Sequence, residues 1–248
     1  MNRILGIDVG ATGIKSAIVD LQEGTLITER FKLQTPVSGK PKEMIDVIHQ
    51  IVEHFDWEGK PIGLGFPAII KNDISWSASN IHESWIGFKI KNEIEAQTGC
   101  SCVVINDADA AGLAELSFGK GKGIKGTMIL LTLGTGIGSA IFNDGVLLPN
   151  TELGHLKYKD SIAEKYAANS SRKLKDLSWE EYGTELNDVL EHIDFVFSPN
   201  LILLGGGISK KFKNFSDYIS SGLNVCPAEK FNNAGIIGAA LAYKIYGK

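Results

Sequence analysis

Two neighbouring polar side chains, Asn106 and Asp107, stand where a short apolar run ends and a helical pattern begins. Open α/β proteins place ligands at the carboxyl ends of their strands, so a carboxylate here can accept the proton of a substrate hydroxyl. An aspartate performs this role when an alcohol attacks a phosphoryl group. Asn and Asp are also good helix caps. Taken alone, the pair favours capping over catalysis.

A second chemical grouping lies in the other half of the chain, where Glu152 and His155 follow a turn at residues 148–150. A lone glutamate or histidine is usually a surface residue or a satisfied core residue. A carboxylate and an imidazole this close together can hydrogen-bond vicinal hydroxyl groups of a sugar. The other four histidines lack such a neighbour and are interpreted as structural.

The strongest internal signal is a repeated glycine-threonine turn. Residues 12–18 match residues 135–141 at six of seven positions. The copies are separated by about half of the 248-residue chain. Each copy follows a strand-like run and leads into another, which favours two duplicated halves over a chance match.

Two such turns suit a chain of phosphates. Glycines let backbone N–H groups point inward as an anion site, and the hydroxyl groups of Thr12 and Thr135 add donors. The sequence holds no P-loop, and the turn at residues 10–13 leads into a strand, which counts against a dinucleotide-binding fold. For the matched pair, phosphate binding is favoured over a purely structural turn.

Asp8 lies inside the first strand-like run, between two apolar residues. A charge there is costly unless it is satisfied, so the carboxylate is expected to face a ligand rather than the core. Near phosphates its natural partner is Mg²⁺, held directly or through water. Lys15 either neutralises phosphate or lies in solvent, and both interpretations stay open.

The apolar pattern predicts alternating strands and helices around these groups. Strands are expected at residues 4–9, 14–19, 26–33, 61–66, 102–105, 127–133, 137–142 and 200–204. Helices are expected at residues 41–55, 90–98, 108–118 and 233–246, with helical composition over 161–197. Residues 68–90 are expected to be irregular. The lysine-rich segment 119–126 is interpreted as a surface turn, with a landing site for a polyanion as the alternative.

Composition narrows the function classes. The net charge of −4 argues against a general nucleic-acid binder, which needs a basic surface. No stretch of about 18 apolar residues is free of charges and breakers, so no membrane span is expected. The chain runs from Met1 straight into a strand without a signal segment, and three cysteines are too few for a disulfide framework. A reduced, cytoplasmic protein is expected.

Several glycine-rich and polar segments recur in a family-specific combination, at residues 7–15, 63–67, 106–108, 133–138, 152–155 and 204–207. In this order they resemble the ROK family of sugar kinases and repressors, and the resemblance runs essentially from end to end. Further segments look most like the polyphosphate glucokinase branch of the family. These segments are residues 80–87, 149–156, 226–229 and 232–235.

The resemblance implies an α/β protein with the duplicated actin-like ATPase, ribonuclease H-like fold, in which two domains surround a central cleft. The expected domains are residues 1–117 and 118–233, with a helix at 234–248 packing back on the first. The family's base position falls on Asp107, which would accept the proton of the glucose O6 hydroxyl. The residues expected to hold the sugar are Asn80, Asn106, Glu152, His155 and, with less direct support, Glu164.

The donor side follows from the same resemblance. Asp8 would hold Mg²⁺, directly or through water, and glycine loops would hold the phosphates. The residues expected to bind phosphate are Gly10, Thr12, Gly13, Lys15, Thr132, Gly134, Thr135, Gly136, Gly205, Gly206 and Gly207.

Three departures from the family pattern matter. Many members carry a cysteine-rich zinc motif after the Glu-x-Gly-His element, whereas residues 157–173 hold no cysteine, so no zinc is expected. Ala11 and Ala68 stand where glycine is more usual, which bears on the geometry of the donor loop. No helix-turn-helix segment precedes Ile4, which speaks against the repressor branch.

The expected reaction is transfer of a phosphoryl group from polyphosphate, and also from ATP, to the O6 hydroxyl of glucose with Mg²⁺. One alternative is an ATP-dependent kinase of another hexose, such as fructose or an N-acyl amino sugar. A different class of protein, a non-catalytic sugar sensor, is disfavoured by the intact pair Asn106 and Asp107. No nucleic-acid or membrane partner is expected, and a homodimer is expected from the resemblance alone.

Overall fold

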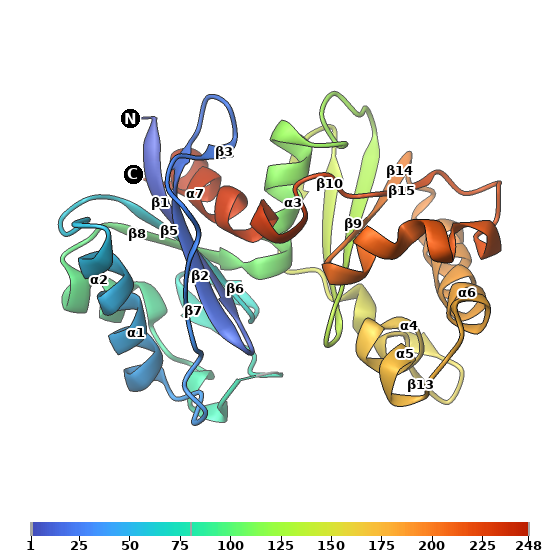
Figure 1. Ribbon diagram of the computed structural model, residues 1–248, viewed down its shortest axis with the longest axis horizontal. Coiled ribbons are helices and arrows are strands. Elements are labelled where there is room, and N and C mark those ends of the chain that lie inside the picture. The colour runs from blue at the N-terminus through green and yellow to red at the C-terminus, as the bar shows by residue number, and fades with distance from the viewer. Residues whose placement is uncertain (1, 80, 248) are drawn as a thin grey trace. The chain divides into compact units, whose positions relative to one another are not determined.

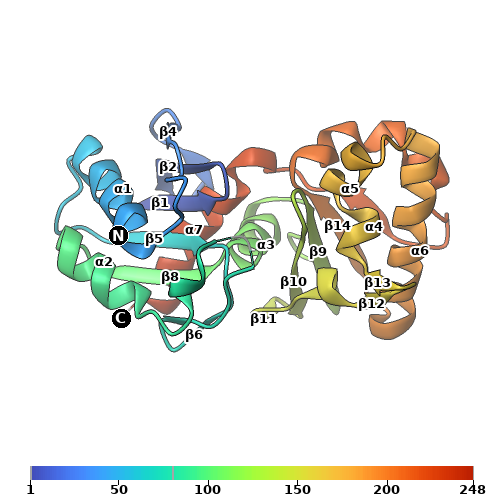
Figure 2. The same cartoon turned by 90° about the horizontal axis from the view of Figure 1, so that it is seen from below.

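The computed structural model describes residues 2–79 and 81–247 (Figures 1 and 2). The chain divides into two compact units. The first unit is formed by the chain up to Ala114 together with the segment from Asn233 onward, and the second unit is Glu115–Asn232. Each unit has its own central sheet and its own apolar core.

The first unit contains a six-stranded mixed sheet in the order β3-β2-β1-β5-β8, with β4 also pairing with β2. Strands β1 and β2 form an antiparallel hairpin, while β1, β5 and β8 run parallel. The strands are β1 (Arg3–Gly10), β2 (Gly13–Asp20), β3 (Thr25–Leu26), β4 (Phe31–Leu33), β5 (Ile62–Phe66) and β8 (Cys102–Asn106).

The single strand predicted over residues 26–33 is wrong, because two short strands occupy this segment. The Thr28 hydroxyl accepts the N–H of Ile18 at 3.0 Å, where a regular ladder would use a backbone carbonyl. The side chain therefore interrupts the pairing with β2 between β3 and β4.

Helices cover both faces of the first sheet. Helices α1 (Pro41–His54) and α2 (Ile90–Thr98) lie on one face, and α7 (Ala234–Tyr246) lies on the other (Figure 1). Alternate residues of β1, including Ile7 and Val9, face the apolar core beneath α1, as the two-residue period of a strand requires. The helices predicted at residues 41–55, 90–98 and 233–246 are confirmed.

Helix α7 approaches the sheet so closely that side chains do not fit between them. A methyl group on Gly6 of β1 or Gly63 of β5 would overlap backbone oxygens of α7. A methyl group on Gly238 of α7 would overlap the carbonyl oxygen of Ala110 in α3 (Asp107–Phe118). Backbone contacts backbone at these three glycines, so the position of α7 depends on their lack of a side chain.

The segment predicted to be irregular, residues 68–90, is partly ordered into a small hairpin. Strands β6 (Ile70–Lys71) and β7 (Ile74–Ser75) pair with each other, and a 3₁₀ helix, η1 (Glu83–Trp85), follows. Trp85 is fully buried and donates its indole N–H to the Gly39 carbonyl at 2.7 Å, so this tryptophan belongs to the core.

The second unit repeats the strand order of the first. Its sheet runs β11-β10-β9-β14-β15, with an antiparallel hairpin of β9 and β10 followed by parallel β14 and β15. The sequence repeat thus corresponds to equivalent hairpins in two sheets of the same order. The strands are β9 (Thr127–Leu133), β10 (Ile137–Asn143), β11 (Val146–Leu148), β14 (Leu201–Gly205) and β15 (Val225–Pro227).

The helical composition predicted over residues 161–197 corresponds to three separate helices, and only residues 161–162 at its start belong to a strand. The hairpin of β12 (Lys157–Tyr158) and β13 (Ser161–Ile162) leads into the short helices α4 (Glu164–Ala167) and α5 (Asn169–Leu174). A new helix, α6 (Trp179–Phe197), then starts at a capping box. The Ser178 hydroxyl accepts the Glu181 N–H at 3.2 Å, and the Glu181 carboxylate accepts the Ser178 N–H at 2.8 Å.

Short 3₁₀ helices complete the second unit. They are η2 (Leu153–His155), η3 (Gly207–Asn214) and η4 (Ser216–Tyr218), and η5 (Phe231–Asn233) leads into α7. Within the described residues, no helix has both the length and the apolar character needed to cross a bilayer.

Substitution of Gly238 by alanine tests the backbone contact between α7 and α3. Alanine favours a free helix over glycine by about 1 kcal/mol, but here its methyl group meets the Ala110 carbonyl, so the helices must separate. We expect a loss of about 1–3 kcal/mol, seen as a midpoint of thermal unfolding lowered by roughly 3–10 °C. Lys244→Ala, on an exposed position of the same helix, is the control. An unchanged or raised midpoint for Gly238→Ala would contradict the close contact.

Candidate functional site

The carboxyl edge of the first sheet carries polar side chains from β1 and β8, on the two sides of β5. Asp8 of β1 is paired in register with Gly65 of β5, and Gly65 with Ile105 of β8. Asn106 and Asp107 follow directly. A Cβ atom on Gly65 would lie at van der Waals distance, 3.6 Å, from the Cα atom of Asp107, so Gly65 lies directly beside Asp107 at this edge. Asn106 and Asp107 therefore lie at the carboxyl end of a strand, as the sequence predicts.

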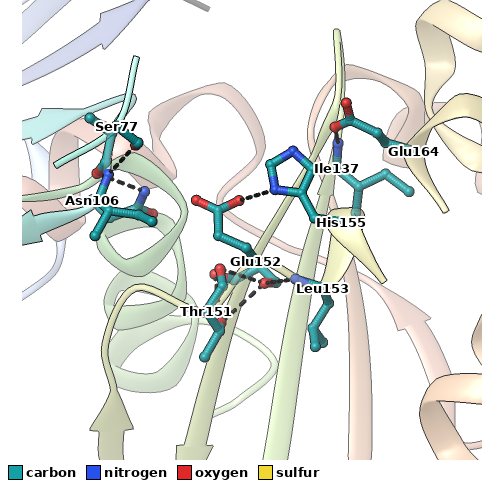
Figure 3. Close-up of polar contacts among 11 residues, drawn as sticks. Ser77, Asn106, Ile137, Thr151, Glu152, Leu153, His155 and Glu164 are labelled. Atoms are coloured by element: carbon teal, nitrogen blue, oxygen red, sulfur yellow. Dashed lines mark hydrogen bonds and ion pairs between the residues drawn. The ribbon is translucent and has the colours of Figure 1, made fainter. Parts of the chain in front are cut away.

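Asn106 caps helix α3. Its Oδ1 atom accepts the N–H groups of Ala108 at 2.8 Å and of Asp109 at 3.1 Å. Its amide Nδ2 donates to the Ala68 carbonyl at 3.2 Å, and the side chain is buried (Figure 3). Capping is thus a role that the contacts establish, whereas sugar binding by Asn106 stays a prediction.

Asp107 is the first residue of α3. Its Oδ1 atom accepts the N–H of Ala108 at 2.9 Å, which holds the carboxylate at the helix N-terminus. The positive end of the helix dipole stabilises the ionised carboxylate there. The side chain is only partly buried, which suits a group that exchanges a proton with a substrate hydroxyl.

Asp8 is mostly buried, with 16% of its side chain exposed, and it forms an ion pair with Lys15 at 3.3 Å. Gly235, in the first turn of α7, lies directly against it, because a methyl group there would come within 2.7 Å of the Asp8 carboxyl carbon. Over the described ranges, no group of three or more His, Cys, Asp or Glu side chains is placed to hold a metal ion. A single carboxylate is nevertheless compatible with Mg²⁺, which commonly takes its other ligands from phosphate and water.

The first glycine-threonine turn joins β1 to β2. Gly10 pairs with Gly13, and the Gly10 carbonyl accepts the Thr35 hydroxyl at 2.6 Å. Thr12 is exposed at the turn. Ala11 has no positive φ, so its methyl group is tolerated in place of the more usual glycine. Thr35 had no signal in the sequence, because its contact spans 25 residues.

The second glycine-threonine turn, at residues 134–136, lies beside the glycine loop at residues 205–207. Gly205, at the end of β14, pairs in register with Thr132 near the end of β9. Gly206 adopts φ 78°, and a side chain there would lie 2.6 Å from the Leu133 carbonyl oxygen. The Ser209 hydroxyl donates to the Gly206 carbonyl at 2.7 Å. Three of the predicted phosphate-binding segments of the second unit therefore meet at one edge of its sheet. They are Thr132, Gly134–Gly136 and Gly205–Gly207.

Glu164 contacts the second turn directly. Its Oε2 atom accepts the N–H of Ile137 at 3.3 Å (Figure 3). A methyl group on Gly136 would overlap the same carboxylate oxygen. The Ser170 N–H also donates to the Gly134 carbonyl at 3.0 Å, so α5 and Glu164 together hold this turn. The Ile137 N–H is consequently already occupied by an anionic group of the protein.

Glu152 and His155 contact each other, as the sequence predicts for a pair. Their nearest atoms, Oε2 of Glu152 and Nδ1 of His155, are 3.5 Å apart (Figure 3). Burial raises the pKa of Glu152 above its ordinary value; the nearby His155 opposes this shift and Glu164 adds to it. The two carboxylates and the imidazole therefore form one cluster in the second unit.

A buried serine of β10 positions this cluster. The Ser139 hydroxyl accepts the Leu153 N–H at 2.9 Å and donates to the Thr151 carbonyl at 2.8 Å (Figure 3). Thr151 returns a hydrogen bond from its hydroxyl to the Ser139 carbonyl at 3.1 Å. The residue before and the residue after Glu152 are thus anchored to the sheet. The sequence showed Ser139 only as part of the repeat, not as an anchor.

The predicted site residues therefore form two groups, one in each unit. Those of the first unit lie on β1, β2, the turn between them, β8 and the start of α3. They are Asp8, Gly10, Thr12, Gly13, Lys15, Asn106 and Asp107. Those of the second unit are Thr132, Gly134, Thr135, Gly136, Glu152, His155, Glu164, Gly205, Gly206 and Gly207. Asn80 lies outside the described residues.

The sequence of this chain is similar to a known protein family and to characterised relatives. The sequence profile of the ROK family matches residues 4–164. A polyphosphate glucokinase of Mycobacterium tuberculosis is 42% identical over 238 residues, covering 96% of this chain and 89% of the relative. A polyphosphate glucokinase of Mycobacterium leprae is 39% identical, covering 97% of this chain and 74% of the relative.

Solved structures of sugar kinases have the same fold as this chain. The inorganic polyphosphate/ATP-glucomannokinase of Arthrobacter sp. strain KM superposes with a TM-score of 0.95 at 41% identity, covering 99% of each chain. A ROK family glucokinase of Streptomyces griseus, in complex with glucose and AMPPNP, gives a TM-score of 0.81 at 23% identity, covering 96% of this chain and 98% of the other. The predicted actin-like ATPase fold is confirmed, and with it the resemblance drawn from the motifs. This chain belongs to the ROK family.

Proposed function

We propose that this protein is a sugar kinase that transfers a phosphoryl group from inorganic polyphosphate, and also from ATP, to the O6 hydroxyl of glucose. The observation that carries the proposal is the 42% identity to a polyphosphate glucokinase over 96% of the chain. The Arthrobacter relative, whose name includes both donors, supports polyphosphate and ATP as alternatives. The carboxylate at the start of α3 supports the chemistry.

Asp107 is the general base of the proposed reaction. It accepts the proton of the O6 hydroxyl as the oxygen attacks the terminal phosphorus, and the bond from phosphorus to the leaving phosphate oxygen breaks. The N–H of Ala108 donates to its Oδ1 atom at 2.9 Å and so fixes the position of the carboxylate at the start of α3. Phosphoryl transfer otherwise depends on positioning and on charge around the phosphate.

The sugar is held by hydrogen bonds to its hydroxyl groups. Glu152 and His155 supply an acceptor and a donor 3.5 Å apart, a spacing that suits two neighbouring hydroxyls. The residues assigned to the sugar are Asn80, Asn106, Glu152, His155 and Glu164.

The phosphate chain is held by the glycine turns. In the first unit these are Gly10 to Gly13 with Lys15; in the second they are Gly134 to Gly136, with Thr132 and the loop at Gly205 to Gly207. Asp8 is the residue that would hold Mg²⁺, which supplies positive charge to the phosphate oxygens. No zinc enters the proposal.

We further propose a cytoplasmic location, and a homodimer as the family resemblance implies. It also treats residues 1–117 and 118–233 as the two domains, with the α7 segment returning to the first. The location, the oligomeric state and the domain bounds are independent of the assignment of Asp107 as the base.

A coupled assay of glucose 6-phosphate formation tests the function. Purified protein is given glucose and Mg²⁺ with either long-chain polyphosphate or ATP, and turnover is expected with polyphosphate. A sugar panel of mannose, fructose and an N-acyl amino sugar identifies any other acceptor. Binding of glucose by calorimetry without turnover on any donor would instead indicate a sugar sensor. Absence of both glucose binding and turnover would contradict the proposed sugar-kinase function.

Asp107→Asn tests the base. The amide keeps an oxygen for the Ala108 N–H, so α3 stays capped, but it cannot accept a proton. We expect kcat to fall about 10²–10⁴-fold, with glucose binding by calorimetry retained. Asp144→Asn is the matched control, since the Asp144 carboxylate also accepts a backbone N–H, that of Gly126 at 2.8 Å. Wild-type turnover in Asp107→Asn would show that another group is the base.

The raised pKa of Glu152 predicts a pH dependence of glucose binding. The ionised carboxylate accepts sugar hydroxyls, and burial together with Glu164 shifts its protonation to higher pH than for an ordinary glutamate. As pH falls through this raised pKa, the KM for glucose is expected to rise while the KM for the donor does not. In Glu152→Gln this component of the profile should vanish and the KM for glucose should be high throughout. An unchanged profile in the variant would remove Glu152 from the sugar site.

A further inference from the structure

Three charged side chains form a row across the first sheet, close to the glycine-threonine turn. Asp8 of β1 is paired in register with Lys15 of β2, and Lys15 is paired with Lys32 of β4. Directly paired residues of antiparallel strands project from the same face of a sheet. Asp8, Lys15 and Lys32 therefore project from one face. Asp8 lies two residues before Gly10 and Lys15 two residues after Gly13, so the row lies beside the turn that joins β1 to β2.

The neighbours of Lys32 fix which face this is. Phe31 stacks on His54 of α1, with ring centroids 3.7 Å apart, and Leu33 packs on the apolar core beneath α1 and α2. Because side chains alternate along a strand, Lys32 projects from the opposite face. Lys32 is exposed, while both of its neighbours are partly buried. Its direction is thus set by two anchored apolar residues.

The charges in this row do not balance. Lys15 has Asp8 as its partner at 3.3 Å. Like charges placed directly opposite each other on neighbouring strands are unfavourable. Within the part of the chain that the structure describes, Lys32 forms neither an ion pair nor a hydrogen bond. Two lysines and one aspartate leave one positive charge, which an anion would neutralise.

The end of the Lys32 side chain lies against Gly13, the residue at which the turn passes into β2. A methyl group built on Gly13 would overlap the Cε atom of Lys32 and lie 3.1 Å from its Nζ atom. The lysine stem therefore occupies the space that a side chain at position 13 would fill. Farther along the same segment, the Thr35 hydroxyl donates to the Gly10 carbonyl at 2.6 Å. The segment after β4 is thereby tied to the turn.

We propose that Lys32 is a phosphate-binding residue of the first turn. The inference rests on the proposed function, since the ligand is the phosphate chain of polyphosphate or ATP. Backbone N–H groups of the turn give a phosphate group directed hydrogen bonds but no formal charge. Lys32 adds a positive charge beside that of Lys15, which is paired with Asp8. Gly13 is then required for two reasons, the turn and the space for the lysine.

Kinetics of Lys32→Met test the assignment. Methionine keeps an unbranched stem over Gly13 and removes only the charge. We expect the KM for polyphosphate to rise about tenfold, the size of one charge-assisted hydrogen bond, with kcat and the KM for glucose within about twofold. Lys32→Arg should restore most of the affinity. Lys42→Met, an exposed lysine of the same unit, is the matched control. Equal donor KM values in Lys32→Met and Lys42→Met would overturn the proposal.

Direct binding separates this proposal from the proposed function. Inorganic tripolyphosphate is titrated into the intact protein by calorimetry, which needs no turnover. A wild-type protein that binds tripolyphosphate but transfers no phosphate, with binding weakened in Lys32→Met, would keep the site and remove the kinase function. Binding equal in wild type and Lys32→Met overturns the site, and no binding by the wild type overturns it as well. Thermal midpoints of the variants within about 2 °C of wild type, less than a change of about 1 kcal/mol produces, exclude misfolding as the cause.

Discussion

The first unit depends on backbone-to-backbone contact between α7 and its neighbours. Glycines at positions 6 and 63 let the helix lie on the sheet, and Gly238 lets it lie on α3. This contact brings the first turn of α7 against Asp8, where the positive end of the helix dipole favours a carboxylate. It also places α7 beside α3, the helix that begins with Asp107. The surroundings of Asp8 and Asp107 therefore depend on glycines, whose lack of a side chain lets α7 lie close to the sheet and to α3.

Sequence patterns predicted the parts of this protein that local chemistry determines. The repeated turn predicted two equivalent hairpins, and the strand before Asn106 predicted a polar edge; both predictions are confirmed. Errors arose where long-range contacts decide the backbone. The stretch of helical composition from residue 161 to residue 197 divides into three helices after a short strand, and β11 and β15 are edge strands too short to have a periodicity. Thr35 carried no signal and Ser139 appeared only as part of the repeat, because their partners lie 25 and 14 residues away along the chain.

The two halves of the repeat have diverged at equivalent serines. Ser139 anchors the residues on both sides of Glu152, so its hydroxyl has both a donor and acceptors. Ser16, the matching position, is buried opposite Phe31, and its hydroxyl finds no partner among the described residues. The same small residue therefore organises an acidic cluster in one unit and only fills space in the other. Assignments of roles by repeat symmetry alone would miss this difference.

The contiguity of the second unit has a consequence for how the chain folds during synthesis. Glu115–Asn232 is complete in itself, whereas the first unit requires a helix that is translated only after that whole segment. Domains generally fold as they emerge from the ribosome. The second unit can therefore close while the first sheet still lacks α7 on one face, with Gly6 and Gly63 uncovered. During that interval the nascent first unit is the part of the protein exposed to chaperones, proteases and misassociation.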